Sequence, residues 1–156
     1  MASLIHRLAE ECESSDQFSA DARMQLLALL MYPIARNMKT GRALSQQVED
    51  SMRYLFRHFR EDISLTQVAE RSGYTPNYFS HLFHESCGIR FVDFLTRLRL
   101  NYARSALLTT SLSVSQIAQS SGFSSSSNFF RAFRQETGQS PLEYRTAHTS
   151  RKQPSG

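Results

Sequence analysis

The chain has 156 residues, enough for one domain or two small ones and too few for a large barrel or a multidomain enzyme. Hydrophobic residues make up 40% and charged residues 21%, which is ordinary for a globular protein and excludes disorder throughout. The net charge is +4, and 16 of the 18 basic side chains are arginine, whose planar guanidinium binds phosphate and guanine through paired hydrogen bonds.

Positive charge is concentrated in the second two-thirds of the chain. Residues 1–50 carry five basic and seven acidic side chains, whereas residues 51–156 carry 13 and seven. This asymmetry indicates a polyanionic partner. An anionic membrane would attract the same charge, but no stretch reaches the roughly 18 apolar residues of a membrane span, and the N-terminus lacks a secretory signal. We therefore expect a cytoplasmic protein with no membrane partner.

Two short helices are predicted in residues 1–44, around residues 4–8 and 24–34, with Pro33 kinking or ending the second. They offer an apolar docking surface, and we expect any homodimer to form through them. A third amphipathic helix follows, because apolar residues recur at i, i+4, i+7 and i+11. These residues are Val48, Met52, Leu55 and Phe59.

An internal repeat organises the rest of the chain. SLTQVAERSGY at residues 64–74 matches SVSQIAQSSGF at residues 113–123, 49 residues later. Each segment opens with Ser-x-x-Gln, a capping box that starts a helix, and reaches a glycine where a positive φ turns the chain. The pattern predicts two short helices, each followed by a tight turn at Gly73 or Gly122.

A second helix follows each turn, at about residues 76–86 and 126–136. Thr75 caps the first, with Pro76 at its first position, and Ser124 or Ser125 caps the second. Apolar residues at i, i+3 and i+4 predict the inner faces: Phe79, Leu82 and Phe83, then Phe129, Ala132 and Phe133. The outer faces are polar or basic, apart from one phenylalanine: Asn77, Ser80, His81 and His84, then Ser127, Phe130, Arg131 and Arg134.

Two short helices with a tight turn and a polar outer face form a helix-turn-helix. The predicted fold class is therefore all-α, with two helix-turn-helix subdomains and extra N-terminal helices.

Residues across about 47–146 resemble the AraC/XylS family of bacterial transcription regulators. The matching residues include Ile63, Leu65, Ala69, Gly73, Phe79, Phe83, Gly88, Phe91, Phe94, Arg97, Leu107, Ala118, Gly122, Phe129, Phe133, Gly138, Pro141 and Tyr144. The resemblance implies a double helix-turn-helix DNA-binding domain over residues 45–146, followed by a flexible tail over 147–156. It also implies that a long connecting helix over residues 91–108 joins the two helix-turn-helix subdomains of the all-α fold. Residues 1–44 are too short for the family's usual effector-binding barrel. They are either the last helices of such a domain or the docking surface of a short regulator.

The resemblance places base contacts at Asn77, Ser80 and His81 and at Ser126, Ser127 and Arg131. Phosphate contacts are expected at Thr75, His84 and Arg134. Phe130 departs from the family, and we hypothesise that it packs on a thymine methyl.

Each of these roles has a plainer alternative. Arg131 either binds guanine or is a surface arginine held by a carboxylate, and Asn77 either pairs with adenine or is a solvated helix-start residue. His81 either contacts DNA or is solvated. Phe130 could instead pack sideways on the connecting helix. Asn128 replaces an aromatic residue of the family.

The sequence favours a sequence-specific regulator of transcription that binds double-stranded DNA. The resemblance implies activation through contact with RNA polymerase. The alternative is a non-specific DNA-binding or protein-interaction module. An enzyme is not expected, because no nucleophile, phosphate-binding or metal-binding motif is present.

We expect no cofactor and no metal, and Cys12 and Cys87 are interpreted as small buried hydrophobes. Arginines 90, 97, 99 and 104 are expected to be solvated or paired, Arg97 for instance with Asp93.

Overall fold

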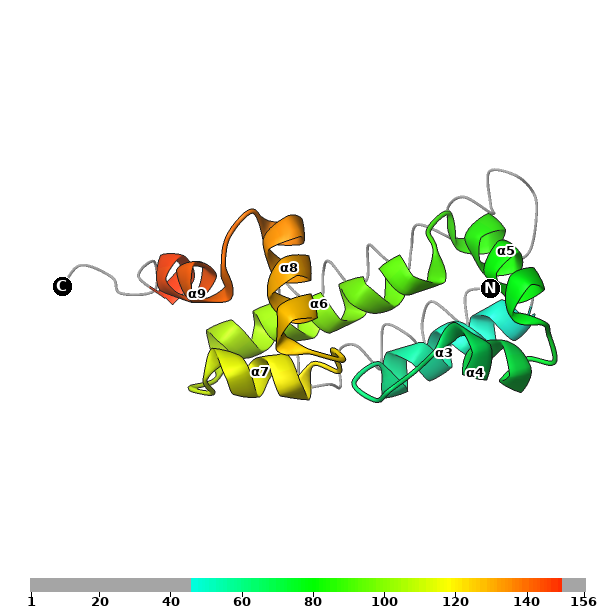
Figure 1. Cartoon of the computed structure of the whole chain (residues 1–156), viewed down its shortest axis with the longest axis horizontal. Coiled ribbons are helices and arrows are strands. Elements are labelled where there is room, and N and C mark those ends of the chain that lie inside the picture. Colours follow the sequence, from blue (N-terminus) through cyan, green and yellow to red (C-terminus); the bar gives the residue numbers. More distant parts are fainter. Residues whose placement is uncertain (1–45, 150–156) are drawn as a thin grey trace.

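The computed structural model describes residues 46–149, which form seven helices and no strand. The helices are α3 (Gln46–His58), α4 (Leu65–Arg71), α5 (Pro76–Cys87), α6 (Phe91–Thr109), α7 (Val114–Ser120), α8 (Ser126–Thr137) and α9 (Pro141–Thr149). Figure 1 shows an elongated molecule in which α6 joins the helices at the two ends. The predicted all-α fold is confirmed, whereas the expected N-terminal helices, with their docking surface, lie outside the described residues.

Both predicted capping boxes are present, and they start α4 and α7 in the same way. The Ser64 hydroxyl accepts from the Gln67 amide N–H at 3.2 Å, and the Gln67 side chain accepts from the Ser64 amide at 2.8 Å. The equivalent bonds of Ser113 and Gln116 have the same lengths. Each box satisfies two N–H groups that a helix start leaves without partners. The helices therefore begin where the repeat predicts.

The first apolar core joins α3, α4 and α5 to the first half of α6. Phe79, Phe83 and Phe94 are fully buried, and the rings of Phe83 and Phe94 meet edge to face with centroids 5.5 Å apart. The predicted stripe of α3 also faces this core: Val48, Met52, Leu55 and Phe59. Cys87 packs among these residues, and burial raises its pKa to about 12, so that the thiol stays protonated at neutral pH. For Cys87, the interpretation as a buried hydrophobe is confirmed.

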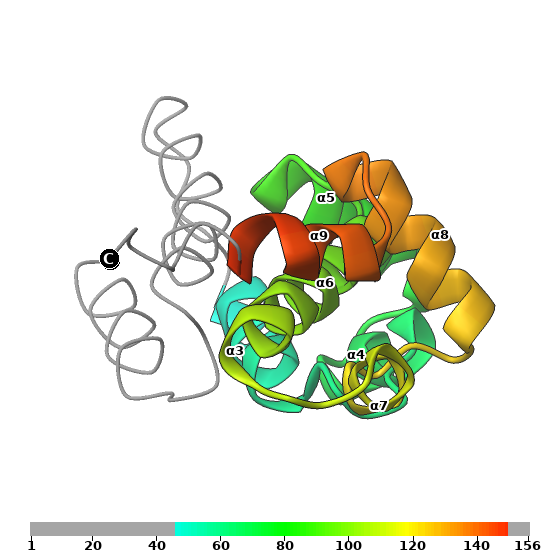
Figure 2. The same cartoon turned by 90° about the vertical axis from the view of Figure 1, so that its left-hand side faces the viewer.

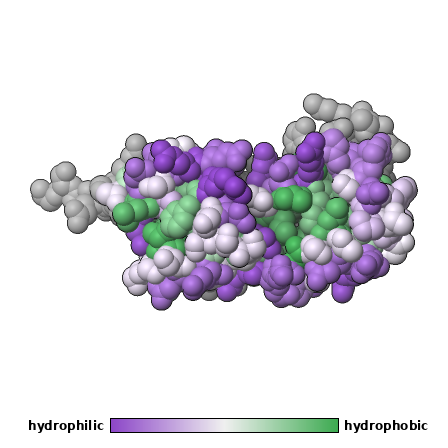
Figure 3. Space-filling view, viewed as in Figure 1, coloured by the Kyte–Doolittle hydropathy of each residue, from purple (hydrophilic) through white to green (hydrophobic). Residues whose placement is uncertain are grey.

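The second apolar core is smaller and is separate from the first. Leu100, Ala103 and Leu107 of α6 pack there with the inner faces of α7 and α8. Leu98 belongs to the first core and Leu100 to the second, so the two cores meet near the middle of α6. Figure 3 shows two separate apolar areas on a largely hydrophilic face. Each helix-turn-helix unit therefore has its own core.

The last helix, α9, extends to Thr149, two residues past the predicted start of the tail at residue 147. Arg145 donates hydrogen bonds from α9 to the carbonyl oxygens of Leu107 at 3.1 Å and Leu112 at 2.6 Å. The His148 ring stacks on Tyr144 with centroids 4.2 Å apart. These contacts explain why the helix continues. Residues 150–156 lie outside the description.

No helix within residues 46–149 is both long and apolar enough to cross a bilayer. In the same range, no group of three His, Cys, Asp or Glu side chains is arranged to hold a metal ion.

Candidate nucleic-acid interface

The first candidate recognition helix is α5, and its inner face anchors it to the core. The Thr75 hydroxyl caps the helix by accepting from the Tyr78 amide at 3.4 Å, and Pro76 is the first helical residue. Phe79 and Phe83 are fully buried. On the opposite face, Asn77, His81 and His84 are exposed and Ser80 is half-buried. The predicted orientation of the two faces is thus observed.

The second candidate recognition helix is α8, built on the same plan. Of the two serines that could cap this helix, Ser125 is the cap: its hydroxyl accepts a hydrogen bond from the Asn128 amide at 3.2 Å. Phe129 and Phe133 are fully buried. The exposed face presents every residue that the sequence predicts for it: Ser126, Ser127, Phe130, Arg131 and Arg134.

The two candidate recognition helices lie on one side of the molecule. In Figures 1 and 2, which are related by a quarter turn, α5 and α8 lie above α6, whereas α4 and α7 lie below it. The side of α6 that carries α5 and α8 is therefore opposite the side that carries α4 and α7.

Arg131 is oriented by its neighbour on α8, Asn128. Its Nη2 donates to the Asn128 Oδ1 at 2.8 Å, and the Asn128 Nδ2 donates to the Ser124 hydroxyl at 3.0 Å. No ion pair between Arg131 and a carboxylate occurs within residues 46–149. A neutral amide holds the guanidinium without cancelling its charge, so Arg131 remains available to an anionic or guanine-like partner. The spacing of three residues between Asn128 and Arg131 could have indicated this bond.

Phe130 is 42% exposed. Its ring meets Phe129 edge to face, with centroids 5.4 Å apart. The exposed part of the ring lies on the same face as Arg131 and Arg134. The contact with Phe129 holds the ring in place without removing it from solvent.

Glu85 is an acidic neighbour of the candidate surface that the sequence reasoning missed. Its Oε2 lies 3.8 Å from the His81 Nδ1, one helical turn away on α5. A second carboxylate, Glu143 of α9, lies near Arg134. Hydrogen bonds from Ser140 are the main cause that lowers the pKa of Glu143, and the Arg134 charge contributes less. Acidic groups therefore lie at the borders of the surface, beside His81 and Arg134.

Arg90, which precedes α6, and the arginines within α6 differ in their surroundings. Arg99 donates to two backbone carbonyl oxygens, those of Phe59 and Glu61. Arg104 donates to the Asn101 side chain. Arg90 and Arg97 are exposed. Of the two expected states, solvated or paired, Arg99 and Arg104 are paired, with backbone carbonyls and an amide rather than with carboxylates.

Fold and surface together define a class of protein: an all-α, double helix-turn-helix domain. The helix-turn-helix domain family matches residues 68–147. Among solved structures, the C-terminal domain of AraT, a response regulator from Geobacillus stearothermophilus, is 34% identical with a TM-score of 0.64, covering 67% of this chain and 87% of that one. The DNA-binding domain of AdpA in complex with a target DNA is 26% identical with a TM-score of 0.66, covering 69% and 97%.

Curated relatives carry the same type of domain within longer proteins. An uncharacterized HTH-type transcriptional regulator of Staphylococcus aureus (strain N315) is 31% identical over 147 residues, which is 93% of this chain and 20% of that protein. One from Escherichia coli (strain K12) is 29% identical over 154 residues, covering 96% and 54%. The chain thus spans between about a fifth and about half of these relatives. It belongs to the AraC-type helix-turn-helix family of transcriptional regulators, as the motifs indicated.

Proposed function

We propose that the protein binds double-stranded DNA in a sequence-specific way and regulates transcription, as an activator, through this binding. The supporting observation is the duplicated unit. The inner face of α5 packs in the first apolar core and that of α8 in the second, and each helix leaves its polar or cationic face open to solvent. The AdpA domain, which resembles this chain, was solved in complex with a target DNA. Two helices of this kind in one chain favour DNA over a protein partner.

The length of α6 supports the reading of two neighbouring groove segments by one molecule. Its 19 residues correspond to about 28 Å at a rise of 1.5 Å per residue. Successive major-groove faces of a duplex are about 34 Å apart. Since α5 and α8 lie on the same side of α6 (Figures 1 and 2), both can approach one duplex.

Base reading is assigned to residues on the exposed faces of α5 and α8. Arg131 donates two hydrogen bonds to guanine O6 and N7, and Asn77 pairs with adenine N6 and N7. The remaining base-reading residues are Ser80, His81, Ser126, Ser127 and Phe130. Thr75, His84 and Arg134 contact phosphate oxygens, which positions the protein on the duplex but carries no sequence information.

The regulatory role extends the proposal beyond residues 46–149. As an activator, the protein contacts RNA polymerase while bound to its site. Residues 1–44 act as the dimerisation or docking segment, and residues 150–156 form the tail. Binding to the chromosome places the protein in the cytoplasm. No step in this proposal requires a catalytic group or a cofactor.

A binding selection from randomised duplexes tests the proposal. We expect one sequence to be enriched and to bind roughly 10³-fold or more tightly than random DNA. Affinity measured at two salt concentrations should fall with a log–log slope of about −0.9 for each phosphate neutralised. Equal affinity for random and selected duplexes would indicate the alternative, a non-specific module. No measurable DNA binding at low salt would contradict both.

Phe130 gives a specific prediction for this selection. Phe130→Ser should relax a preference for an A·T pair at one position, because the contact with the thymine methyl is lost. Phe130→Leu is the matched control, since it keeps an apolar side chain and should retain most of the preference. If Phe130→Ser lowers the melting temperature and leaves the selected sequence unchanged, the ring serves only to pack on Phe129.

A further inference from the structure

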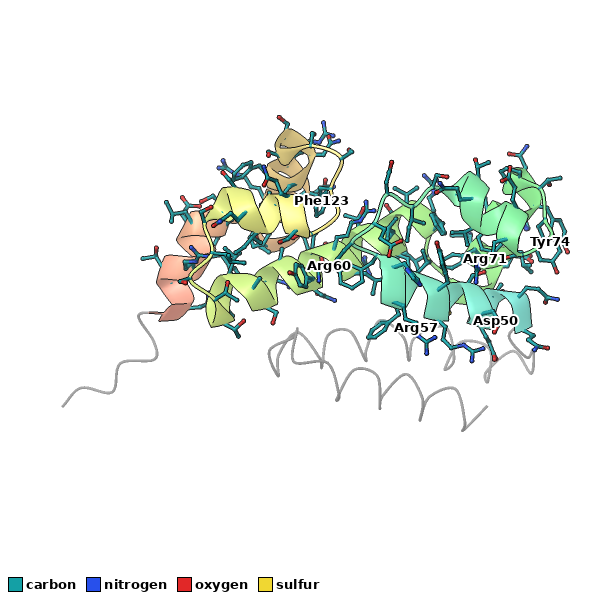
Figure 4. The ribbon with its side chains drawn as sticks, turned by 90° about the horizontal axis from the view of Figure 1, so that it is seen from below. Asp50, Arg57, Arg60, Arg71, Tyr74 and Phe123 are labelled. Atoms are coloured by element: carbon teal, nitrogen blue, oxygen red, sulfur yellow. The ribbon has the colours of Figure 1, made fainter. Side chains whose placement is uncertain are left out.

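The two helix-turn-helix units touch each other directly, away from the axis of α6. The contact, which we name the junction, joins residues 59–61, which follow α3, to residues 120–123, which are the end of α7 and the turn after it. The Arg60 Nε donates to the Ser120 carbonyl oxygen at 3.1 Å, and the Arg60 guanidinium lies 4.9 Å from the centre of the Tyr102 ring on α6. Figure 4 shows Arg60 and Phe123 near the middle of α6.

Arg99 of α6 stabilises the junction through hydrogen bonds. Its Nε donates to the Phe59 carbonyl oxygen at 2.7 Å, and its Nη2 donates to the Glu61 carbonyl oxygen at 2.8 Å. The same guanidinium lies 6.0 Å from the centre of the Phe123 ring, in the turn of the other unit. Burial lowers the pKa of Arg99 below its usual value. The two hydrogen bonds offset the unfavourable burial of a charge, and the planar guanidinium presents a separate nitrogen to each carbonyl.

Gly122 allows the two units to approach this closely. A Cβ atom at this position would lie 2.7 Å from both the Arg60 Cα and the Phe59 carbonyl oxygen, which are backbone atoms that cannot rotate away. Gly73, at the equivalent position of the first unit, has nearly the same φ, +75° against +82°, but a Cβ there would meet nothing within 4 Å. Both glycines are needed for the turn. Only Gly122 is also needed for contact between the units.

We propose that the junction holds α5 and α8 at one separation and angle. Arg60, Arg99 and Gly122 thereby set the spacing between the two DNA segments that α5 and α8 of one chain read, which we call half-sites. The connecting helix by itself is a single rod that can curve. A second contact away from its axis restrains bending and twisting. These three are positioning residues, because they act through the placement of α5 and α8. The inference rests on the proposed function, in which both helices enter one duplex.

The matched pair Gly122→Ala and Gly73→Ala separates the junction from the turn. Both changes force alanine to adopt a positive φ, so they share the same backbone strain, but only Gly122→Ala pushes the units apart. The measurement is affinity for duplexes whose selected half-sites are separated by the preferred spacing, or by one or two base pairs more or fewer. Wild type and Gly73→Ala should keep one sharp spacing optimum. For Gly122→Ala, the ratio of affinity at the preferred spacing to affinity at altered spacing should fall about tenfold.

Arginine variants test the same inference without changing a glycine. Arg60→Ala and Arg99→Lys should both broaden the spacing optimum, because lysine retains the charge but offers a single nitrogen in place of the Nε and Nη2 that bond the two carbonyls. Arg97→Ala is the control, since Arg97 lies exposed on the same helix. It should change affinity by the same factor at every spacing.

A measurement without DNA distinguishes failure of this inference from failure of the proposed function. Spin labels are attached at exposed Glu85 of α5 and Gln135 of α8, by Glu85→Cys and Gln135→Cys in a background where both native cysteines are replaced. The distance distribution between the labels should broaden with Gly122→Ala and stay narrow with Gly73→Ala. An unchanged distribution would overturn the inference even if specific DNA binding is found. Affinity lost equally at all spacings would also overturn it, because the junction would then only stabilise the fold.

Discussion

Phe133→Ala is expected to lower the free energy of unfolding by about 3–5 kcal/mol, the usual cost of emptying a fully buried phenylalanine site. Phe133 is 0% exposed and meets the Phe129 and Tyr144 rings at centroid distances of 5.6 and 5.5 Å. Removing it leaves a cavity between α8, α9 and α6. Urea unfolding followed by circular dichroism measures the loss.

The effect of Phe133→Ala should be confined to the second unit. Phe133 belongs to the second core only, and the first core has its own aromatic cluster. Hydrogen exchange should show amides of α7 and α8 losing protection while those of α5 keep theirs. Phe130→Ala, on the same helix but 42% exposed, is the control, with an expected loss of about 1 kcal/mol from its edge-to-face contact. An equal loss of protection in both units would mean that the two cores unfold as one.

Arg131→Ala is expected to weaken binding to the selected duplex by about 1–3 kcal/mol and to relax the preference at one base pair. The loss falls on a single position because a bidentate contact reads one guanine. The measurement is titration against the selected duplex and its single-base variants. Asn128→Ala should have a smaller effect of the same kind, because it removes the bond that orients Arg131, together with the bond to Ser124, but leaves the guanidinium in place.

Arg134→Ala is the counterpart of Arg131→Ala. As a phosphate contact, Arg134 should contribute equally to every sequence, and its loss should reduce the salt slope by about 1. Its effect should be uniform across the single-base variants. If both arginine variants relaxed sequence preference to the same degree, the separate roles of Arg131 and Arg134 would be wrong.

The elements of the fold could be predicted from the sequence because their signals are local. A capping box needs only a serine and a glutamine three residues apart, and the turn needs a glycine that accepts positive φ. The inner faces of α5 and α8 follow from apolar residues at i, i+3 and i+4. Because each of these interactions spans at most one or two helical turns, the 49-residue repeat was sufficient to predict both units and the faces that they expose.

The surroundings of individual side chains were decided by tertiary structure. Arg99 could not be distinguished from Arg97 in the sequence, because the carbonyls that Arg99 binds lie about 40 residues away along the chain. The helical spacing of Glu85 from His81 and of Asn128 from Arg131 permits their contacts but does not decide them, since helix position alone does not say which rotamer a side chain adopts.

Gly73 and Gly122 show most clearly which features the local sequence determines and which depend on tertiary structure. By itself, the sequence determined that Gly73 and Gly122 each end a short helix, because the same local motif surrounds both. Only the folded chain determined that Gly122 lies against the backbone of Arg60 while Gly73 faces open space. The reason is that a motif specifies local backbone conformation, whereas contact between units depends on how α6 places residues 60 positions apart.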